Sequence, residues 1–270
     1  MLLKRILLLS GVLSIAGYCV GIYESIFLIP IVFLLCVLAL ILLWAVSCFI
    51  CTRFVNMKKE YNESSRLYRF YTNCIIDSLN QLLRVKLRVS GKEILPKEKF
   101  LFVCNHRGAM DPLITMGVLR NYNMGFVAKK EIYKIPIISR LMHRCFCLCL
   151  NRDDIKEGAK TILKASTFIK DDKASIGIYP EGTRNTKKEM LPFMNGAFKI
   201  AKKANCPIVI ATIKNTEVIM KHAPFKKTEV FLDFVGVLDK EFVGENNTAQ
   251  ISDKVRAIME RSLSTEKSSI

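Results

Sequence analysis

The sequence predicts an α/β fold, with a mainly parallel sheet covered by helices on both faces and an N-terminal hydrophobic helical hairpin ahead of it. From about residue 85 onward, short apolar runs typical of buried strands alternate with helical patterns. Before that point, two almost uncharged apolar stretches follow each other, interrupted by Glu24 and Ser25. The alternation indicates the sheet, and the paired stretches indicate the hairpin.

The first apolar stretch runs from Ile6 to Ile22 and the second from Ile26 to Ile50. Both are long enough for membrane helices, although the first is near the lower limit and could instead be an interfacial or re-entrant segment. Lys4 and Arg5 also fit the start of a cleaved signal peptide, but the second stretch favours an anchor that is kept. We expect residues 1–57 to form this hairpin.

The distribution of charge around the hairpin predicts its orientation. The tip between the two stretches carries Glu24, whereas both outer ends carry basic residues. Because cytoplasmic flanks of membrane helices are enriched in lysine and arginine, both ends are expected in the cytoplasm, with the globular part facing that leaflet. The basic residues are Lys4 and Arg5 before the hairpin and Arg53, Lys58 and Lys59 after it.

Residues 58–84 are predicted to hold an amphipathic helix. Between Tyr61 and Leu83, apolar side chains recur at steps of three and four residues, with charged side chains between them. Such a helix either lies on a membrane surface or packs on the domain, and the pattern leaves both possibilities open.

Residues 85–263 are predicted to form one domain, followed by a frayed tail at 264–270. We find no internal repeat and no linker long enough to divide this region. The predicted strands are Val85–Val89, Phe100–Cys104, Met124–Ala128, Phe146–Leu150, Ser175–Tyr179, Pro207–Ile213 and Glu229–Val237, and the predicted helices are Pro112–Asn121, Ile135–Arg144, Ile155–Ile169, Ala197–Lys203 and Ile251–Leu263.

A histidine and an aspartate, His106 and Asp111, follow the predicted strand Phe100–Cys104. Asp111 precedes Pro112, so it is expected at the N-cap of a helix, where the connecting loop can fold its carboxylate back toward the imidazole. A carboxylate that accepts a hydrogen bond from one ring nitrogen leaves the other nitrogen free to act as a base. The simpler alternative is that Asp111 only caps the helix.

A second polar motif, Glu181-Gly182-Thr183-Arg184, follows the predicted strand Ser175–Tyr179 and Pro180. Glycine allows backbone to approach a ligand closely, threonine offers a hydroxyl, and the guanidinium of arginine matches the oxygens of a phosphate. Both motifs should meet at the carboxyl edge of the sheet, where α/β proteins bind ligands. A plain turn with a surface ion pair is the alternative.

Lys129 also falls at the end of a predicted strand, Met124–Ala128. This placement makes it a candidate phosphate contact at the same edge of the sheet. The alternative is a solvated surface lysine.

The two motifs, in their order and their placement after strands, resemble those of the glycerophospholipid acyltransferase family, most closely its 1-acylglycerol-3-phosphate acyltransferases. Asn105, His106 and Asp111 match the family's first motif in full. Glu181–Arg184 matches the third motif, with Asn185 at a position where serine is common.

The second and fourth family motifs are present in altered form, and the resemblance spans about residues 85–237. The second motif corresponds to Phe146–Arg152, which keeps Arg152 but lacks the usual glycine and aspartate. The fourth corresponds to Cys206–Ile210 and lacks the second proline. These departures do not change the predicted reaction class, but they leave the identity of the acceptor open.

In this family the histidine is the general base and the aspartate orients it, so the resemblance implies these roles for His106 and Asp111. It implies that the acyl group passes from acyl-acyl carrier protein or acyl-coenzyme A to the sn-2 hydroxyl of lysophosphatidic acid, giving phosphatidic acid without a cofactor. Another lysophospholipid, glycerol-3-phosphate, or a non-catalytic lipid-binding role are the alternatives. The residues expected to hold the glycerol phosphate are Arg152, Glu181, Gly182, Thr183 and Arg184.

Composition bears on the partner and the compartment. A net charge of +17 fits either nucleic acid or an anionic membrane surface. The chain carries apolar stretches of bilayer length and no zinc-finger or RNA-recognition signature, so we expect an anionic membrane surface and no nucleic acid.

The cysteines of the chain predict neither a metal site nor a nucleophile. Cys145, Cys147 and Cys149 alternate with a period of two, which suits a strand better than the ligand spacing of a zinc knuckle. Cys104 lies in an apolar run beside His106 and is expected to be a small core residue. The globular part is expected to lie in a reducing compartment.

Overall fold

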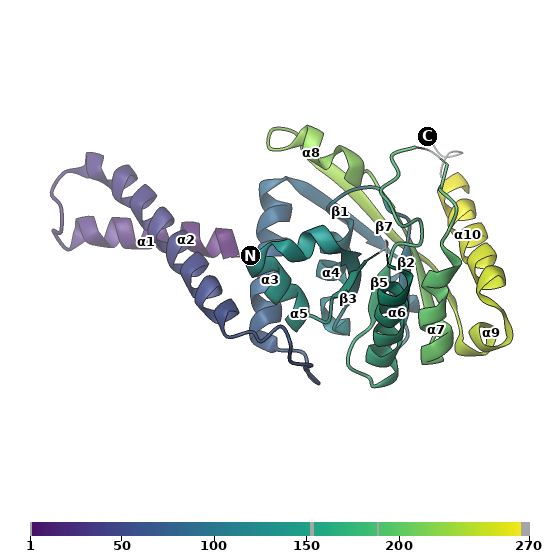
Figure 1. Ribbon diagram of the computed structural model, residues 1–270. Helices are drawn as coiled ribbons and strands as arrows, with labels where there is room; N and C mark the ends of the chain where they lie inside the picture. The colour runs from purple at the N-terminus through teal and green to yellow at the C-terminus, as the bar shows by residue number, and fades with distance from the viewer. Residues whose placement is uncertain (1, 152–153, 188, 266–270) are drawn as a thin grey trace.

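The computed structural model describes residues 2–151, 154–187 and 189–265. Its centre is a 7-stranded sheet with the order β1-β7-β6-β2-β5-β3-β4, which confirms the predicted α/β class (Figure 1). Among the described residues, the pair β6 and β7 is antiparallel and the other neighbouring strands run parallel. The strands are β1 (Val85–Ser90), β2 (Leu101–Cys104), β3 (Gly125–Lys129), β4 (Leu148–Leu150), β5 (Ile176–Ile178), β6 (Ile208–Lys214) and β7 (Thr228–Leu238).

Helices cover both faces of the sheet, because its central strands bury side chains on both sides (Figure 1). Successive residues of a strand point to opposite faces. In β2, Leu101 and Val103 therefore pack with α6, α7 and α10, whereas Phe102 and Cys104 pack with α3 and α4. The helices of the domain are α3 (Arg66–Leu82), α4 (Asp111–Val118), α5 (Pro136–Arg144), α6 (Ile155–Lys170), α7 (Lys199–Ala204), α8 (Ile219–His222), α9 (Lys240–Glu245) and α10 (Thr248–Thr265).

The hydrophobic hairpin consists of α1 (Leu2–Cys19) and α2 (Ile29–Arg53), which project together from one side of the domain (Figure 1). Both helices are long and apolar enough to cross a membrane. In the most apolar 18-residue stretch of α2, no residue is buried in the protein. This helix is therefore not a core helix of the domain. The base of α2 meets the domain where Trp44 and Cys48 pack against Tyr71 of α3.

The predicted amphipathic helix forms, but it begins at Arg66 rather than at Tyr61. Tyr61 lies in a segment that is not helical. The Arg144 guanidinium lies over the Tyr61 ring, with 3.7 Å between its central carbon and the ring centroid. α3 packs on the domain, with Ile76 fully buried beside α4. Of the two possibilities that the sequence leaves open, the structure shows packing on the domain.

Two further helices differ from the sequence prediction in their boundaries. The predicted helix at Ala197–Lys203 divides into a 3₁₀ turn, Asn195–Phe198, and α7. The final helix continues to Thr265, beyond the point where the sequence predicts a frayed tail, and residues 266–270 lie outside the described part of the chain. The short helices α8 and α9 have too few residues to give a recognisable apolar period.

Candidate active site

The two polar motifs meet because the strands that carry them are neighbours. β2 and β5 pair in parallel, so the loops that follow Cys104 and Ile178 leave the sheet at the same edge. The His106 N–H donates to the Glu181 carboxylate at 2.9 Å, and the Asn185 N–H donates to the His106 carbonyl at 2.7 Å. The backbone of each loop is therefore fixed by the other.

His106 and Asp111 form a hydrogen-bonded pair, with 2.7 Å between Nδ1 and Oδ2. The carboxylate is fully buried and also accepts from the N–H groups of Arg107 at 2.6 Å and Gly108 at 2.8 Å. With Nδ1 directed at the carboxylate, Nε2 is the ring nitrogen left to accept a proton.

The N-cap prediction for Asp111 is wrong. Met110 occupies that position, and Asp111 is the first helical residue of α4. The reason is the direction of the carboxylate, which turns back to the two N–H groups of its own loop instead of capping the helix. The Asp111 carboxylate nevertheless folds back onto the His106 imidazole, as the spacing of the two residues predicts.

Tyr179 is an additional site residue that the sequence did not single out. Its ring stacks on the His106 imidazole, with 4.4 Å between centroids and 22° between planes. Phe126 of β3 also stacks on Tyr179, with 5.9 Å between ring centroids. Burial raises the pKa of the Tyr179 hydroxyl well above its usual value, so the hydroxyl stays protonated at neutral pH. The one available signal in the sequence was its position next to Pro180.

Glu181 holds the two loops together, although the resemblance implies a substrate contact. The carboxylate is 5% exposed. Its Oε2 accepts from the Leu191 N–H at 3.0 Å and from the Asn185 amide at 3.1 Å, while Oε1 accepts from the His106 N–H. A carboxylate with these partners has little capacity left for a ligand and would repel a phosphate.

Asn105 provides a similar support on the other side of β2. Its buried side-chain amide donates to the Ile213 carbonyl at 3.0 Å and its oxygen accepts from the Ile213 N–H at 2.8 Å. These bonds replace strand pairing at the end of β2, where the chain turns toward His106. The asparagine of the first motif is thus a positioning residue.

Arg107 ties the same loop to two further segments. Its guanidinium pairs with Glu217 at 2.6 Å and donates to the carbonyls of Thr186 and Lys187. Burial alone would raise the pKa of the Glu217 carboxyl, but the hydrogen bond and charge of Arg107 outweigh it and hold the pKa below its usual value. The hydrogen bonds from Arg107 therefore hold the loop that carries Arg184 against the loop that carries His106.

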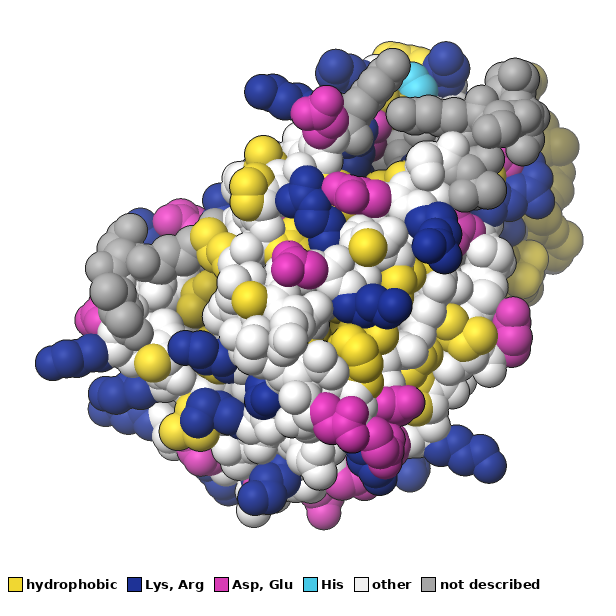
Figure 2. Space-filling view, turned by 90° about the vertical axis from the view of Figure 1, so that its right-hand side faces the viewer, with side chains coloured by type: hydrophobic (Ala, Val, Ile, Leu, Met, Phe, Trp, Pro, Cys, Tyr) yellow, Lys and Arg dark blue, Asp and Glu magenta, His cyan; other side chains and the backbone are white. Residues whose placement is uncertain are grey.

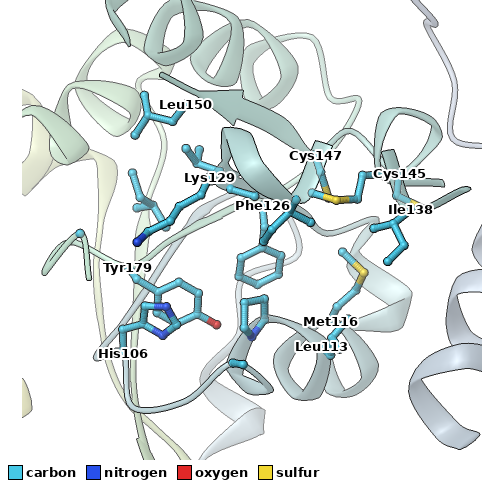
Figure 3. Close-up of a pocket in the computed structure, with 18 of the residues that line it drawn as sticks. His106, Leu113, Met116, Phe126, Lys129, Ile138, Cys145, Cys147, Leu150 and Tyr179 are labelled. Carbon is cyan, nitrogen blue, oxygen red and sulfur yellow. The ribbon is translucent and has the colours of Figure 1, made fainter. Parts of the chain in front are cut away.

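A cavity of about 600 Å³ opens beside His106, within the range of sites that bind small molecules. Figure 3 shows Lys129 extending toward His106 and Tyr179, while Met116 and Ile138 lie on the far side of Phe126. The cavity is therefore polar near the imidazole and apolar beneath α3, α4 and α5. Its apolar lining includes Ile75, Ile76, Leu79, Leu113, Met116, Ile138, Leu141, Met142, Cys145 and Cys147.

The predicted phosphate contacts are distributed unevenly around this cavity. Lys129, Gly182 and Arg184 line it, and both cations are exposed. Gly182 adopts φ 70°, a left-handed conformation that favours glycine. Thr183 is exposed but does not line the cavity, and Arg152 lies outside the described residues.

The cysteines Cys104 and Cys147 near the site are buried and remain protonated thiols. Burial raises the pKa of Cys104 well above its usual value, and that of Cys147 to about 12. A nucleophilic cysteine needs a thiolate, so neither side chain is poised for covalent catalysis. No group of three or more potential metal-ligating side chains occurs among the described residues.

Comparison with known proteins places this arrangement in a family. The family description "Acyltransferase" matches residues 86–214. A 1-acyl-sn-glycerol-3-phosphate acyltransferase of Borreliella burgdorferi is 31% identical over 191 residues, which cover 67% of this chain and 74% of that protein. The chain belongs to the acyltransferase family.

Other members of the acyltransferase family are more distant. The 1-acyl-sn-glycerol-3-phosphate acyltransferase of Saccharomyces cerevisiae is 26% identical over 187 residues. The match covers 68% of this chain but 61% of the yeast protein, less than two thirds of its length.

The fold of a solved acyltransferase extends the likeness to the N-terminal hairpin. The crystal structure of the 1-acyl-sn-glycerophosphate acyltransferase PlsC from Thermotoga maritima matches with a TM-score of 0.63 and 19% identity. The match covers 98% of each chain, so it includes the two apolar helices as well as the acyltransferase domain.

Proposed function

We propose that this chain is a membrane-bound 1-acylglycerol-3-phosphate O-acyltransferase that converts lysophosphatidic acid to phosphatidic acid in phospholipid biosynthesis. One observation carries the proposal. The His106–Asp111 pair stands at the boundary between an apolar cavity and two exposed cations. A substrate with a hydroxyl beside a phosphate, and a donor with a long apolar chain, would both have matching surroundings there.

In the proposed reaction, Nε2 of His106 takes the proton from the sn-2 hydroxyl as its oxygen attacks the thioester carbonyl. The new C–O bond forms, the C–S bond breaks, and the proton is passed on to the departing thiolate. Asp111 stabilises the imidazolium that forms between these steps. A positioned base of this kind typically contributes about 10²–10⁴-fold to the rate.

The phosphate of the acceptor is proposed to bind Lys129, Arg184 and Arg152, with the Gly182 turn and Thr183 beside it. Lys129 and Arg184 support this proposal by lining the same cavity as His106. Glu181 is proposed to act through the loops it joins rather than by contacting the phosphate.

The acyl donor is proposed to be acyl-acyl carrier protein or acyl-coenzyme A, with its chain in the apolar part of the cavity. Most of the side chains that line this part come from α3, α4 and α5. Because hydrocarbon gains roughly 0.8 kcal/mol for each methylene removed from water, such a lining favours a long chain.

The protein is proposed to be anchored in the membrane by α1 and α2, with its catalytic domain in the cytoplasm. The two apolar helices, the basic residues at both ends of the hairpin and the net charge of +17 support this location. An anionic membrane surface would then be a partner, and nucleic acid would not.

The proposal is tested by acyl transfer from a labelled thioester with the detergent-solubilised full chain. Lysophosphatidic acid, lysophosphatidylethanolamine and glycerol-3-phosphate compete as acceptors in one reaction. We expect lysophosphatidic acid to be acylated first, because two exposed cations face the reacting edge. Preference for the zwitterionic lysolipid would contradict the assignment, and transfer to none of the three would favour a non-catalytic lipid-binding protein.

A further inference from the structure

A segment beside the active site has surface properties that acyl transfer does not use. After β6, the chain forms a 3₁₀ turn at Thr216–Val218, then α8 and an exposed loop at 223–227. This segment packs on the catalytic loop, since a Cβ added at Gly108 would lie 2.7 Å from the Thr216 carbonyl oxygen. Any surface that holds this segment therefore lies beside the loop that carries His106.

The segment exposes two large apolar side chains. Phe225 is 88% exposed and Met220 is 66% exposed, whereas the adjoining Ile219 is fully buried. Single exposed apolar residues are ordinary on soluble proteins, so exposure alone decides nothing.

The charges around Met220 and Phe225 indicate what kind of surface they would contact. Three exposed lysines flank them, and no acidic residue occurs between Val218 and Thr228. Apolar side chains bracketed by lysines match a membrane interface, where the apolar groups enter the acyl boundary and the cations bind lipid headgroups. The lysines are Lys221, Lys226 and Lys227.

Hydrogen bonds hold the segment in one shape. The Lys226 N–H donates to the His222 carbonyl at 2.8 Å, and the His222 imidazole bonds the Thr228 hydroxyl at 2.9 Å. The turn is thus fixed to the start of β7, and Phe225 is presented outward on a supported loop. A preformed loop loses less conformational freedom on binding a surface.

The position of the segment suits contact with the membrane that the hairpin enters. In Figure 1, α8 lies at the top of the domain, and the loop beyond it extends toward the side from which α1 and α2 leave. Figure 2 shows several basic side chains, with hydrophobic and acidic ones among them, at the top of the molecule, the height at which α8 lies in Figure 1.

We infer that the segment 219–227 is a second membrane contact, in which Phe225 and Met220 enter the interface and the three lysines bind anionic lipid headgroups. This contact rests on the proposed action at a membrane, but it is independent of the chemistry at His106. Together with the hairpin, it would hold the mouth of the cavity against the lipid surface. Each lysine near an anionic surface favours contact by roughly fivefold.

Fluorescence of a single tryptophan tests the contact, because Trp44 is the one tryptophan of the chain. The full-length variant Trp44→Phe/Phe225→Trp is assembled into nanodiscs of phosphatidylcholine alone or with phosphatidylglycerol. We expect a shift of emission to shorter wavelength, and quenching by brominated lipids, in the anionic discs. Replacing Lys221, Lys226 and Lys227 by glutamate in this background is expected to abolish both signals.

A matched control places the reporter on the other side of the domain. Trp44→Phe/Ala257→Trp carries it at an exposed position of α10, which lies away from the hairpin in Figure 1. Quenching at position 225 no greater than at 257 would overturn the inference, and equal quenching at 225 in both kinds of disc would overturn the role of the lysines. A concentration-dependent emission shift in detergent without lipid would point to a second copy of the chain instead.

Activity separates this contact from the proposed reaction. For Phe225→Ser, which removes the aromatic side chain that would enter the interface, we expect a loss of about tenfold or more in acyl transfer to an acceptor embedded in anionic vesicles. Transfer to the same acceptor in detergent micelles should be unchanged, because the His106 site is intact. Equal losses in both assays would contradict a membrane role. Absence of transfer by the wild type in both assays would refute the proposed function while leaving the fluorescence result valid.

Discussion

The chemistry proposed for this protein depends on one hydrogen bond at the residue scale. Asp111 accepts from Nδ1 of His106 at 2.7 Å while two backbone N–H groups hold the same oxygen. A buried carboxylate with three donors is a fixed acceptor, and a fixed acceptor determines the orientation of the imidazole. The Tyr179 ring, stacked on the imidazole at 4.4 Å, restricts its tilt.

We predict that Asp111→Asn lowers kcat by about 10²–10⁴-fold. The amide keeps the volume of the carboxylate but would present either an N–H group or a neutral oxygen to Nδ1. Steady-state kinetics with lysophosphatidic acid measure the effect, which should fall on kcat with KM nearly unchanged. A normal kcat would mean that the carboxylate only supports the loop.

Tyr179 offers a pair of variants that separates its ring from its hydroxyl. Because the Tyr179 hydroxyl is buried and makes no hydrogen bond with the described residues, Tyr179→Phe should retain most of the wild-type rate. Tyr179→Ala removes the stacked ring and should cost about 3–5 kcal/mol of stability together with at least tenfold in kcat. Thermal unfolding in detergent and acyl transfer check the two effects. Loss of activity in the Phe variant would instead give the hydroxyl a direct role.

At the scale of elements, the site depends on loops that are joined to one another. Glu181 and Arg107 connect the loop after β2 with the loop after β5, and Arg107 also reaches Glu217 beyond β6. The loops that follow the neighbouring strands β6, β2 and β5 are thereby held together at one edge of the sheet. The short connections explain why positions far apart in the sequence act together.

The Arg107–Glu217 pair predicts a dependence of stability on pH. The pKa of Glu217 is below its usual value of about 4.5, so the pair stabilises the fold above that pH and loses its effect as the pH falls through the folded-state pKa. Glu217→Gln should therefore unfold at a lower temperature than the wild type at pH 7. The difference should shrink below about pH 4.5. A difference that stays constant with pH would show that the charge of Glu217 contributes nothing.

The sequence predicts the strands because the central ones are short apolar runs, whereas β1 and β7 place apolar residues at alternating positions. It predicts less of what the loops do. The direction of the Asp111 carboxylate and the support given by Glu181 depend on backbone N–H groups, which leave no mark on residue type. Tyr179 resembles an ordinary core residue until its neighbour across the sheet edge is known.

At the scale of the whole molecule, the apolar cavity is the proposed site for the lipid substrates. Much of its apolar lining comes from α3, α4 and α5, and α2 of the hairpin packs against α3 where it meets the domain. The dimensions of such a cavity depend on how helices pack, which the periodicity of a sequence does not give.

We predict that Met116 limits the acyl chains that the protein accepts. Met116 lies on the far side of Phe126 from His106 (Figure 3), so Met116→Trp should fill that end of the cavity. Long-chain donors should then lose rate relative to short-chain donors, whereas Met116→Leu, which conserves volume, should keep the wild-type preference. Competition between donors of different lengths measures the change. An unaltered preference in the Trp variant would place the chain elsewhere.

The proposed reaction requires His106 to remove the proton from the acceptor hydroxyl. The most direct measurement is acyl transfer from a labelled thioester to lysophosphatidic acid by the full-length protein and by His106→Ala, with lysophosphatidic acid binding measured on the same samples. We predict that transfer falls by about 10²–10⁴-fold while lipid binding and membrane insertion are retained. Transfer at the wild-type rate in the variant would contradict the claim, because the reaction would then proceed without this base.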